Sequence, residues 1–348
     1  MPLVDADYRQ FEVADTEAGH EALALFKRFV DRLLELRDLS SADRLCLRYS
    51  ISDDDDDDDT GSQDAVANRW ISYALQKQVQ AVEVYVDLVY ADLYTLVLDH
   101  SVFTSRYLRR VLFSNVILGD GFFKQLEMGC PTLEDLSLHD CTISADEISS
   151  LTLKVLTIND SKFSMEHETS ISTPIVTSLT LWNPVDGIAV LKDMASAVTA
   201  SVQLSVSSED FDARGLCQYL WTLSGVKSLE FYYLGKKLTI ERNLQLCPKF
   251  HNLVNLTLGR WCLDANFYAL IIFMQNSPRL EKLTLKLNPF RFQQISQRIV
   301  GELNDRSFTC EHLGIVEVIC SENDPLANHV VDFFVSSGMT PAQIHIKH

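Results

Sequence analysis

The sequence has no long apolar run. The densest one, at residues 269–274, is far too short to span a bilayer. Residues 1–20 are acidic and polar, and they lack the apolar core of a signal peptide. We therefore expect no membrane partner and no secretory leader.

Basic residues are scarce. Thirty Lys and Arg stand against 48 Asp and Glu, which gives a formal net charge of −18. Nucleic acids and anionic membranes attract clustered Lys and Arg, so no nucleic acid is expected as a partner. The acidic balance supports solubility and is compatible with a basic partner.

Cysteines are widely and irregularly spaced. The eight of them form no C-x-x-C pair, so the sequence carries no signal for a zinc or thioredoxin-like site. Thiols at apolar positions act as small hydrophobic groups. We expect no metal, no cofactor and a reducing compartment, the cytosol and/or the nucleus.

Catalytic signatures are missing as well. The chain has no G-x-x-x-x-G-K-[ST] loop, no G-x-S-x-G elbow and no second His four residues after His167. A dispersed triad, whose members meet only in the folded chain, stays open as an alternative. The expected function is nevertheless non-enzymatic, because repeat arrays usually serve as binding surfaces.

What the sequence does contain is a repeat. Residues 133–143 (LEDLSLHDCTI) fit L-x-x-L-x-L-x-x-C-x-L at every specified position, the signature of a leucine-rich repeat. Residues 79–86 begin in the same frame, and nine copies follow. Their first residues are Leu108, Leu133, Leu153, Val176, Thr199, Val226, Leu253, Leu280 and Leu313. The Thr199 copy is degenerate.

The spacing of the copies supports this interpretation. Successive first residues lie 20 to 33 residues apart, and leucine-rich repeats have periods of about 20–29 residues. In the Leu280 copy, Asn288 and Phe290 are also in frame. Residues 216–223 and 265–275, between repeats, have the composition of helices.

The predicted fold class is α/β, a leucine-rich-repeat solenoid with a horseshoe-like parallel sheet and helices on the convex side. Residues 1–64 should hold an amphipathic helix at 21–39, a first strand at 44–49 and a loop. Residues 65–307 should form the repeats, starting with a helix at 65–78. Residues 308–348 should form a C-terminal cap with a helix at 328–337 and a strand at 344–346.

Seven consecutive aspartates occupy residues 53–59. Adjacent like charges repel and resist burial, so we expect a solvated, disordered insertion. A calcium or basic-partner role is the weaker alternative, because the run lacks the alternating ligands, Gly and distal Glu of an EF-hand loop.

Strand alternation predicts which side chains face a partner. In each copy the residues between the apolar positions should point away from the core, onto the concave face. This face is the candidate site for a protein substrate. Its predicted residues are Asp135, Ser137, His139, Asn159, Trp182, Gln203, Glu230, Tyr232, Lys282 and Lys286.

Trp182 and Tyr232 are the most prominent of these, because exposed aromatic side chains supply much of the energy of protein interfaces. The competing interpretation is that each ring only covers a neighbouring repeat, and it is the stronger one for Tyr232. Lys282 and Lys286 have a competing role as solubilising charges.

Several segments resemble the plant F-box/LRR protein family, including its FBD-containing members. The resemblance covers nearly the whole chain from about residue 25. The segments that carry it are 28–37 (RFVDRLLELR), 68–71 (NRWI), 105–115 (SRYLRRVLFSN), 129–136 (GCPTLEDL), and, for the FBD-type tail, 310–318 (CEHLGIVEV) and 333–338 (FFVSSG).

The resemblance implies that the repeats select a protein substrate for an SCF-type E3 ubiquitin ligase, to whose adaptor an N-terminal F-box docks. None of the 27 residues before Arg28 resembles an F-box. The adaptor is therefore an expected partner only if an F-box is present upstream. The alternatives are a truncated product and a repeat-only interaction protein that acts without ubiquitin transfer.

Overall fold

The structure is a computed structural model of the 348-residue chain. It describes residues 3–11, 19–36, 43–51, 60–88, 96–164, 168–185, 187, 189–205, 213–235, 238–239, 247–287, 299–300, 308 and 311–348. The Asp53–Asp59 run, His167, Asn288, Phe290 and Cys310 lie outside the described residues.

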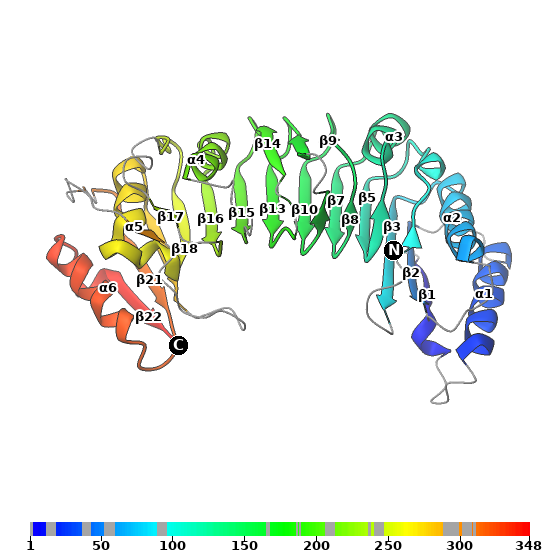
Figure 1. The fold of residues 1–348 in the computed structure, drawn as a ribbon, viewed down its shortest axis with the longest axis horizontal. Coiled ribbons are helices and arrows are strands. Elements are labelled where there is room, and N and C mark those ends of the chain that lie inside the picture. The colour runs from blue at the N-terminus through cyan, green and yellow to red at the C-terminus, as the bar shows by residue number, and fades with distance from the viewer. Residues whose placement is uncertain are drawn as a thin grey trace. The chain divides into compact units, whose positions relative to one another are not determined.

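The chain is α/β, with a large parallel sheet and helices, and it forms two compact units. Unit 1 comprises Met1–Val176 and Val185–Lys192, and unit 2 comprises Thr177–Pro184 and Asp193–His348. Figure 1 labels the elements of both units. The predicted boundaries at 64/65 and 307/308 stay predictions.

Unit 1 is built on six parallel strands in the order β1-β2-β3-β5-β7-β10. Their bounds are β1 Leu3–Asp7, β2 Arg44–Ile51, β3 Ala81–Leu88, β5 Arg110–Ser114, β7 Asp135–His139 and β10 Val155–Asn159. Three helices join them, namely α1 Gly19–Leu36, α2 Thr60–Gln76 and α3 Phe122–Gly129, with the 3-10 turns η1 Tyr8–Gln10 and η4 His100–Val102.

Shorter strands make two further small sheets, in the orders β11-β8-β6-β4 and β14-β12-β9. Their bounds are β4 Leu96–Val97, β6 Val116–Leu118, β8 Thr142–Ile143, β9 Glu147–Ser149, β11 Lys162–Phe163, β12 Ser170–Ser172 and β14 Val190–Asp193.

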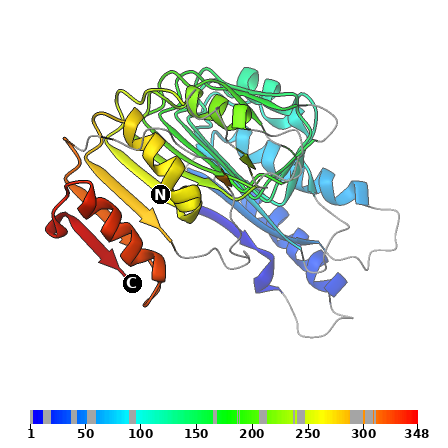
Figure 2. The ribbon, with the colours of Figure 1, turned by 60° about the vertical axis from the view of Figure 1, so that its left-hand side comes forward.

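Unit 2 is built on seven parallel strands in the order β13-β15-β16-β18-β19-β21-β22. Their bounds are β13 Ser178–Trp182, β15 Thr199–Leu204, β16 Ser228–Tyr233, β18 Asn255–Gly259, β19 Lys282–Lys286, β21 Ile315–Ile319 and β22 Ile344–Lys347. The other elements are α4 Ala213–Thr222, β17 Leu238–Thr239, η6 Arg260–Leu263, α5 Asp264–Asn276, β20 Ile299–Val300, α6 Pro325–Ser336 and η7 Pro341–Gln343. Figure 2 shows α5 and α6 beside the last strands of this unit.

The apolar residues of the repeat frame form the core. Leu136 and Leu138 of β7 are buried, whereas Asp135, Ser137 and His139 between them are partly exposed. This alternation follows from strand geometry, because successive side chains point to opposite faces. We call the side of each unit's strands that carries the intervening residues its open face.

The sequence predicted most elements well. The expected helices at 21–39, 65–78, 216–223, 265–275 and 328–337 correspond to α1, α2, α4, α5 and α6. The strands expected at 44–49 and 344–346 are β2 and β22, and both continue a parallel sheet. Helix α1 is amphipathic and buries one face, as its spacing predicted, whereas α5 is buried on all sides from Tyr268 to Met274.

Three expectations were wrong. Strand β1 was not predicted, because its sequence LVDAD is short and acidic. Residues 140–154 hold the short strands β8 and β9, although helices were expected on the convex side of the repeats. The degenerate copy begins at Ala197, because Leu179 is in register with Ala200 and Leu181 with Val202. The frame was not recognised in the sequence because Ala197 and Ala200 occupy two core positions where the other copies have larger apolar residues.

Turns that leave the strands of unit 1 share a left-handed residue. Asn115, Asp140 and Asp160 directly follow β5, β7 and β10, with φ of 57°, 52° and 49°. Asn and Asp tolerate this conformation better than other non-glycine residues. The backbone N–H of Asp140 donates to the Asn159 carbonyl at 3.0 Å, which ties the turn to the next repeat.

Replacing Asp140 tests whether the backbone selects this residue. Asp140→Val should lower the free energy of unfolding by about 1–2 kcal/mol, because a β-branched residue is strained there, whereas Asp140→Gly should change it little. Urea unfolding of the full chain measures both. Equal losses in the two variants would show that the carboxylate matters and the backbone does not.

Candidate functional site

Five of the predicted residues gather on the open face of unit 2. Trp182, Gln203 and Tyr232 are in register at the ends of β13, β15 and β16. Glu230 is two residues before Tyr232 on β16, and Lys286 ends β19. Because neighbouring parallel strands are about 4.8 Å apart, side chains from this row can reach one another.

Glu230 is the centre of a hydrogen-bond network. Its Oε1 accepts from the Tyr232 hydroxyl at 2.6 Å and from Lys286 Nζ at 2.7 Å. Its Oε2 accepts from the Ser201 hydroxyl at 3.1 Å, and Ser201 Oγ accepts from the Trp182 indole N–H at 2.7 Å. The network therefore joins β13, β15, β16 and β19, and we call these five residues the Glu230 cluster.

The network shifts the pKa values of Glu230 and Tyr232. Burial raises the pKa of Glu230, but the hydrogen bonds from Lys286 and Tyr232 outweigh it and hold the pKa below its ordinary value. Burial, and the hydrogen bond to the Glu230 carboxylate, raise the pKa of Tyr232. Glu230 is thus a carboxylate and Tyr232 a neutral donor at neutral pH.

Gly259 makes room for the Tyr232 ring. A Cβ at Gly259 would lie 2.6 Å from Cδ1 of that ring. The backbone there is extended, with φ of −88° and ψ of 176°, so the conformation does not itself require glycine. The ring of Tyr232 leans over β18 only because this position lacks a side chain.

The expected exposure of Gln203 was wrong, whereas the burial of Tyr232 agrees with the stronger interpretation, that its ring covers a neighbouring repeat. Gln203 is 6% exposed and Tyr232 1% exposed. The rings of Trp182 and Tyr232 come from the strands on either side of β15, and their centroids are 5.7 Å apart. Strands two positions apart are separated by about 10 Å, so the Trp182 side chain reaches across β15, where its indole N–H donates to Ser201. Trp182 itself is partly exposed.

Gln203 has an unsatisfied acceptor. Its side-chain Oε1 is buried and has no hydrogen-bond partner. A buried polar atom without a partner costs about 1–3 kcal/mol. Few buried polar groups in native proteins lack a hydrogen-bond partner, and each such group calls for an explanation.

The predicted residues of unit 1 form pairs on its open face. Asp135 Oδ2 is 3.5 Å from Arg110 Nε, and burial raises the pKa of Asp135 above its ordinary value. The side chains of Asn159 and His139 meet at 3.3 Å between Nδ2 and Nδ1. Asn159 Oδ1 is a second buried acceptor without a partner.

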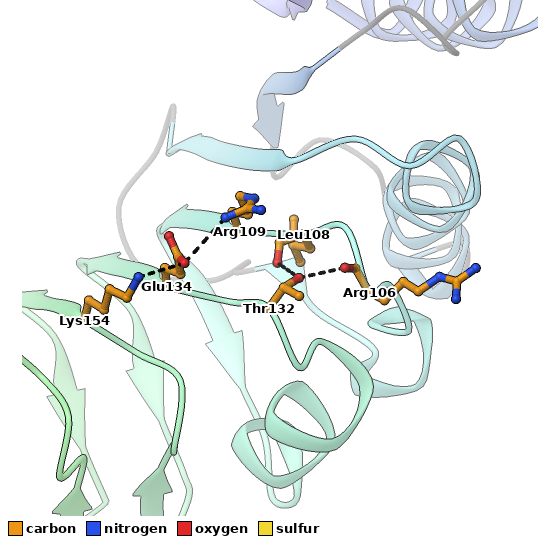
Figure 3. A network of polar contacts seen from close by, with 6 residues as sticks. All are labelled: Arg106, Leu108, Arg109, Thr132, Glu134 and Lys154. Atoms are coloured by element: carbon orange, nitrogen blue, oxygen red, sulfur yellow. Dashed lines mark hydrogen bonds and ion pairs between the residues drawn. The ribbon is translucent and has the colours of Figure 1, made fainter.

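A polar network also crosses these strands at their amino-terminal ends (Figure 3). Glu134 Oε1 accepts from Lys154 Nζ at 2.9 Å and from Arg109 Nη1 at 3.5 Å. Thr132 Oγ1 donates to the carbonyls of Arg106 and Leu108 at 2.8 and 3.0 Å. The ion pairs are exposed and contribute little to stability, so this network mainly aligns successive repeats.

Lys282 belongs to a different cluster of unit 2. Glu317 of β21 accepts from Lys282 Nζ and from Lys347 Nζ, each at 2.9 Å. The hydrogen bonds from Lys347 and Lys282 lower the pKa of Glu317 to about 2. Strands β19, β21 and β22 are thereby connected through one carboxylate.

Acid should abolish the contribution of the Glu317 ion pairs to the stability of the protein. The folded-state pKa of Glu317 lies below its ordinary value of 4.5, so its stabilising effect is fully present above about pH 4.5 and is lost as the pH falls toward about 2. Glu317→Gln should therefore lower the urea midpoint at pH 7, and the gap to wild type should narrow in acid. The exposed Glu322→Gln serves as the control. A gap independent of pH would contradict this account.

Some open-face residues were not predicted from the sequence. Ser201 bridges Trp182 and Glu230, and it faces outward in the Thr199 frame as well, but it was not among the predicted site residues. In unit 1, Glu83 is buried and forms an ion pair with Arg44, and it accepts from the Tyr85 hydroxyl at 3.3 Å. The alternation in residues 44–49 and 79–86 could have identified Arg44, Glu83 and Tyr85 as outward residues.

Among the described residues there is no group of three or more His, Cys, Asp or Glu placed to hold a metal ion. None of the helices in the described part is long and apolar enough to cross a membrane. Seven cysteines are described, all of them are buried, and none forms a disulfide with another described residue. Burial raises the pKa of the Cys141 thiol to about 12, which suppresses its reactivity.

Comparisons with known proteins give one relative of interest. The chain is similar to a rice F-box protein. It is 27% identical over 198 residues to the meiotic F-box protein MOF of Oryza sativa subsp. japonica, and the match covers 51% of this chain and 41% of the relative. The chain thus spans about two fifths of that relative's length. No protein-family model and no solved structure matches.

Proposed function

We propose that this chain is a non-enzymatic protein-recognition scaffold, a leucine-rich-repeat solenoid that holds a protein substrate on the concave side of its sheet. The observation that carries the proposal is the open face. Strand after strand buries its frame residues and presents polar or aromatic side chains on the other side. Such repetition makes an extended recognition surface.

The proposed partner system is an SCF-type E3 ubiquitin ligase, for which the chain would select the substrate. The similarity to the rice F-box protein supports this, as do the segments that resemble the F-box/LRR and FBD families. The match covers 41% of the relative, so the ligase role is a proposal for this chain. The cytosol or the nucleus is the proposed compartment, since unpaired buried thiols are typical of reducing environments.

An interaction protein that binds its target without ubiquitin transfer is the second candidate. It shares the recognition surface and differs only in the link to the ligase.

Co-precipitation of the full chain with the cullin-RING ligase adaptor separates the two. The ligase proposal expects capture above that by a matched acidic control protein. Capture no stronger than the control would overturn the ligase link and leave the second candidate. In parallel, proximity labelling in plant cells should identify protein neighbours that are lost when open-face residues such as Trp182 and His139 are replaced by Ala together.

A further inference from the structure

We propose that the Glu230 cluster and Gln203 form a subsite for one basic side chain, a lysine or an arginine, of the protein partner. The proposal rests on the function proposed above and specifies the chemistry that part of the surface recognises. Its starting point is Gln203, whose Oε1 is a buried acceptor without a donor.

The surroundings of that acceptor are aromatic. Trp182 and Tyr232 are in register with Gln203 on the two neighbouring strands, and their ring centroids are 5.7 Å apart. The indole N–H of Trp182 is directed to Ser201. Trp182 is partly exposed and Gln203 is enclosed, so a donor reaches Gln203 by turning Trp182 aside. Rotamer changes of this kind are fast on the timescale of binding.

The cluster already binds one ammonium group from its own chain. Lys286 Nζ is 2.7 Å from Glu230 Oε1 and 6.0 Å from the centre of the Tyr232 ring. An ammonium or guanidinium group is favoured by a carboxylate together with an aromatic face. The neighbouring strands β13 and β15 add the aromatic ring of Trp182 and the unpaired acceptor Gln203 Oε1.

Charge also favours a basic ligand. The chain carries a net charge of −18, which attracts cationic partners over distances beyond contact. An anionic ligand would instead have to approach Gln203 Oε1 and Glu230, both of which are acceptors. A neutral donor, such as a peptide N–H, satisfies Gln203 but gains less from Glu230.

Peptide display tests the subsite. The purified full chain is used to select random dodecapeptides, and the best binder is synthesised and titrated by calorimetry. We expect the selected peptides to carry a Lys or Arg whose replacement by norleucine or citrulline weakens binding about tenfold or more, which is the loss of one charge-assisted contact. Trp182→Ala should weaken it similarly.

Gln203→Met is the decisive variant, because it keeps the shape of the side chain and removes the acceptor. It should bind the peptide about tenfold more weakly and have a urea midpoint no lower than wild type, since no buried acceptor is left unpaired. Asn255→Ala, an exposed change on the same face, should leave binding unaltered.

Three results would overturn the subsite. They are selected peptides that contain no basic residue, a Gln203→Met variant that binds the peptide with wild-type affinity, and a selection that enriches no peptide. A crystal structure in which a water molecule occupies the Gln203 acceptor both with and without peptide would do the same. Peptides that bind through unit 1, and lose affinity on His139→Ala, would overturn the subsite but leave protein recognition intact.

Discussion

Asp324→Ala should destabilise the protein by about 3 kcal/mol, because it leaves a partly buried arginine unpaired and removes a helix cap. Asp324 Oδ2 is 3.2 Å from Arg260 Nη1, and the Asp324 side chain is 4% exposed. Its other oxygen, Oδ1, accepts from the backbone N–H of Leu326 at 3.0 Å and so begins α6, with Pro325 in the first turn. One carboxylate thus fastens α6 to the segment after β18.

Urea unfolding of the full chain measures the loss, and two further variants divide it. Asp324→Asn keeps the cap and loses the charge, so its destabilisation should be smaller. The double variant Arg260→Met/Asp324→Asn should lose less stability than the sum of the losses in the two single variants. The reason is that the double variant leaves no buried charge without a partner. Strict additivity would contradict the ion pair as the main contribution.

Gly259→Ala should lower the free energy of unfolding by about 1–3 kcal/mol, the usual cost of overpacking. The added methyl group would lie 2.6 Å from Cδ1 of Tyr232 and 3.3 Å from Cδ1 of Trp261. Displacing the Tyr232 ring also breaks its 2.6 Å hydrogen bond to Glu230. The variant should therefore lose both stability and binding at the Glu230 cluster.

A double-mutant cycle tests the cause. In a Tyr232→Val background the methyl group has space, so Gly259→Ala should cost much less there. Gly314→Ala is the matched control, because the nearest atom to its new Cβ is 3.8 Å away, an ordinary contact distance. Equal costs of Gly259→Ala in both backgrounds would show that the clash with Tyr232 is not the reason.

The sequence predicted the face of each side chain better than its exposure. Nine of the ten predicted site residues lie in strands that the frame located, and the tenth, Gln203, lies in β15, whose frame was displaced by two residues. That displacement preserves the alternation, because two residues return a strand to the same face. Ser201, the bridge of the Glu230 network, therefore faces outward in either frame, and nothing in its own strand indicated its contacts with Trp182 and Glu230.

Sequence alone determined which residues face the core and where the strands of the repeats run. These properties depend on short-range alternation, and Leu136, Leu138 and their counterparts satisfy it within a few residues. The helices α4, α5 and α6 were determined in the same way, by apolar spacing within one segment.

Only the tertiary structure decided which outward side chains are accessible. Gln203 is buried between Trp182 and Tyr232 of the neighbouring strands. Tyr232 is buried because Gly259 of β18 leaves space for its ring, and Glu230 meets Lys286 of β19. Such contacts depend on the size and direction of side chains tens of residues away. The alternation of one strand contains no information about them, and for that reason burial of an outward residue had to be found in the fold.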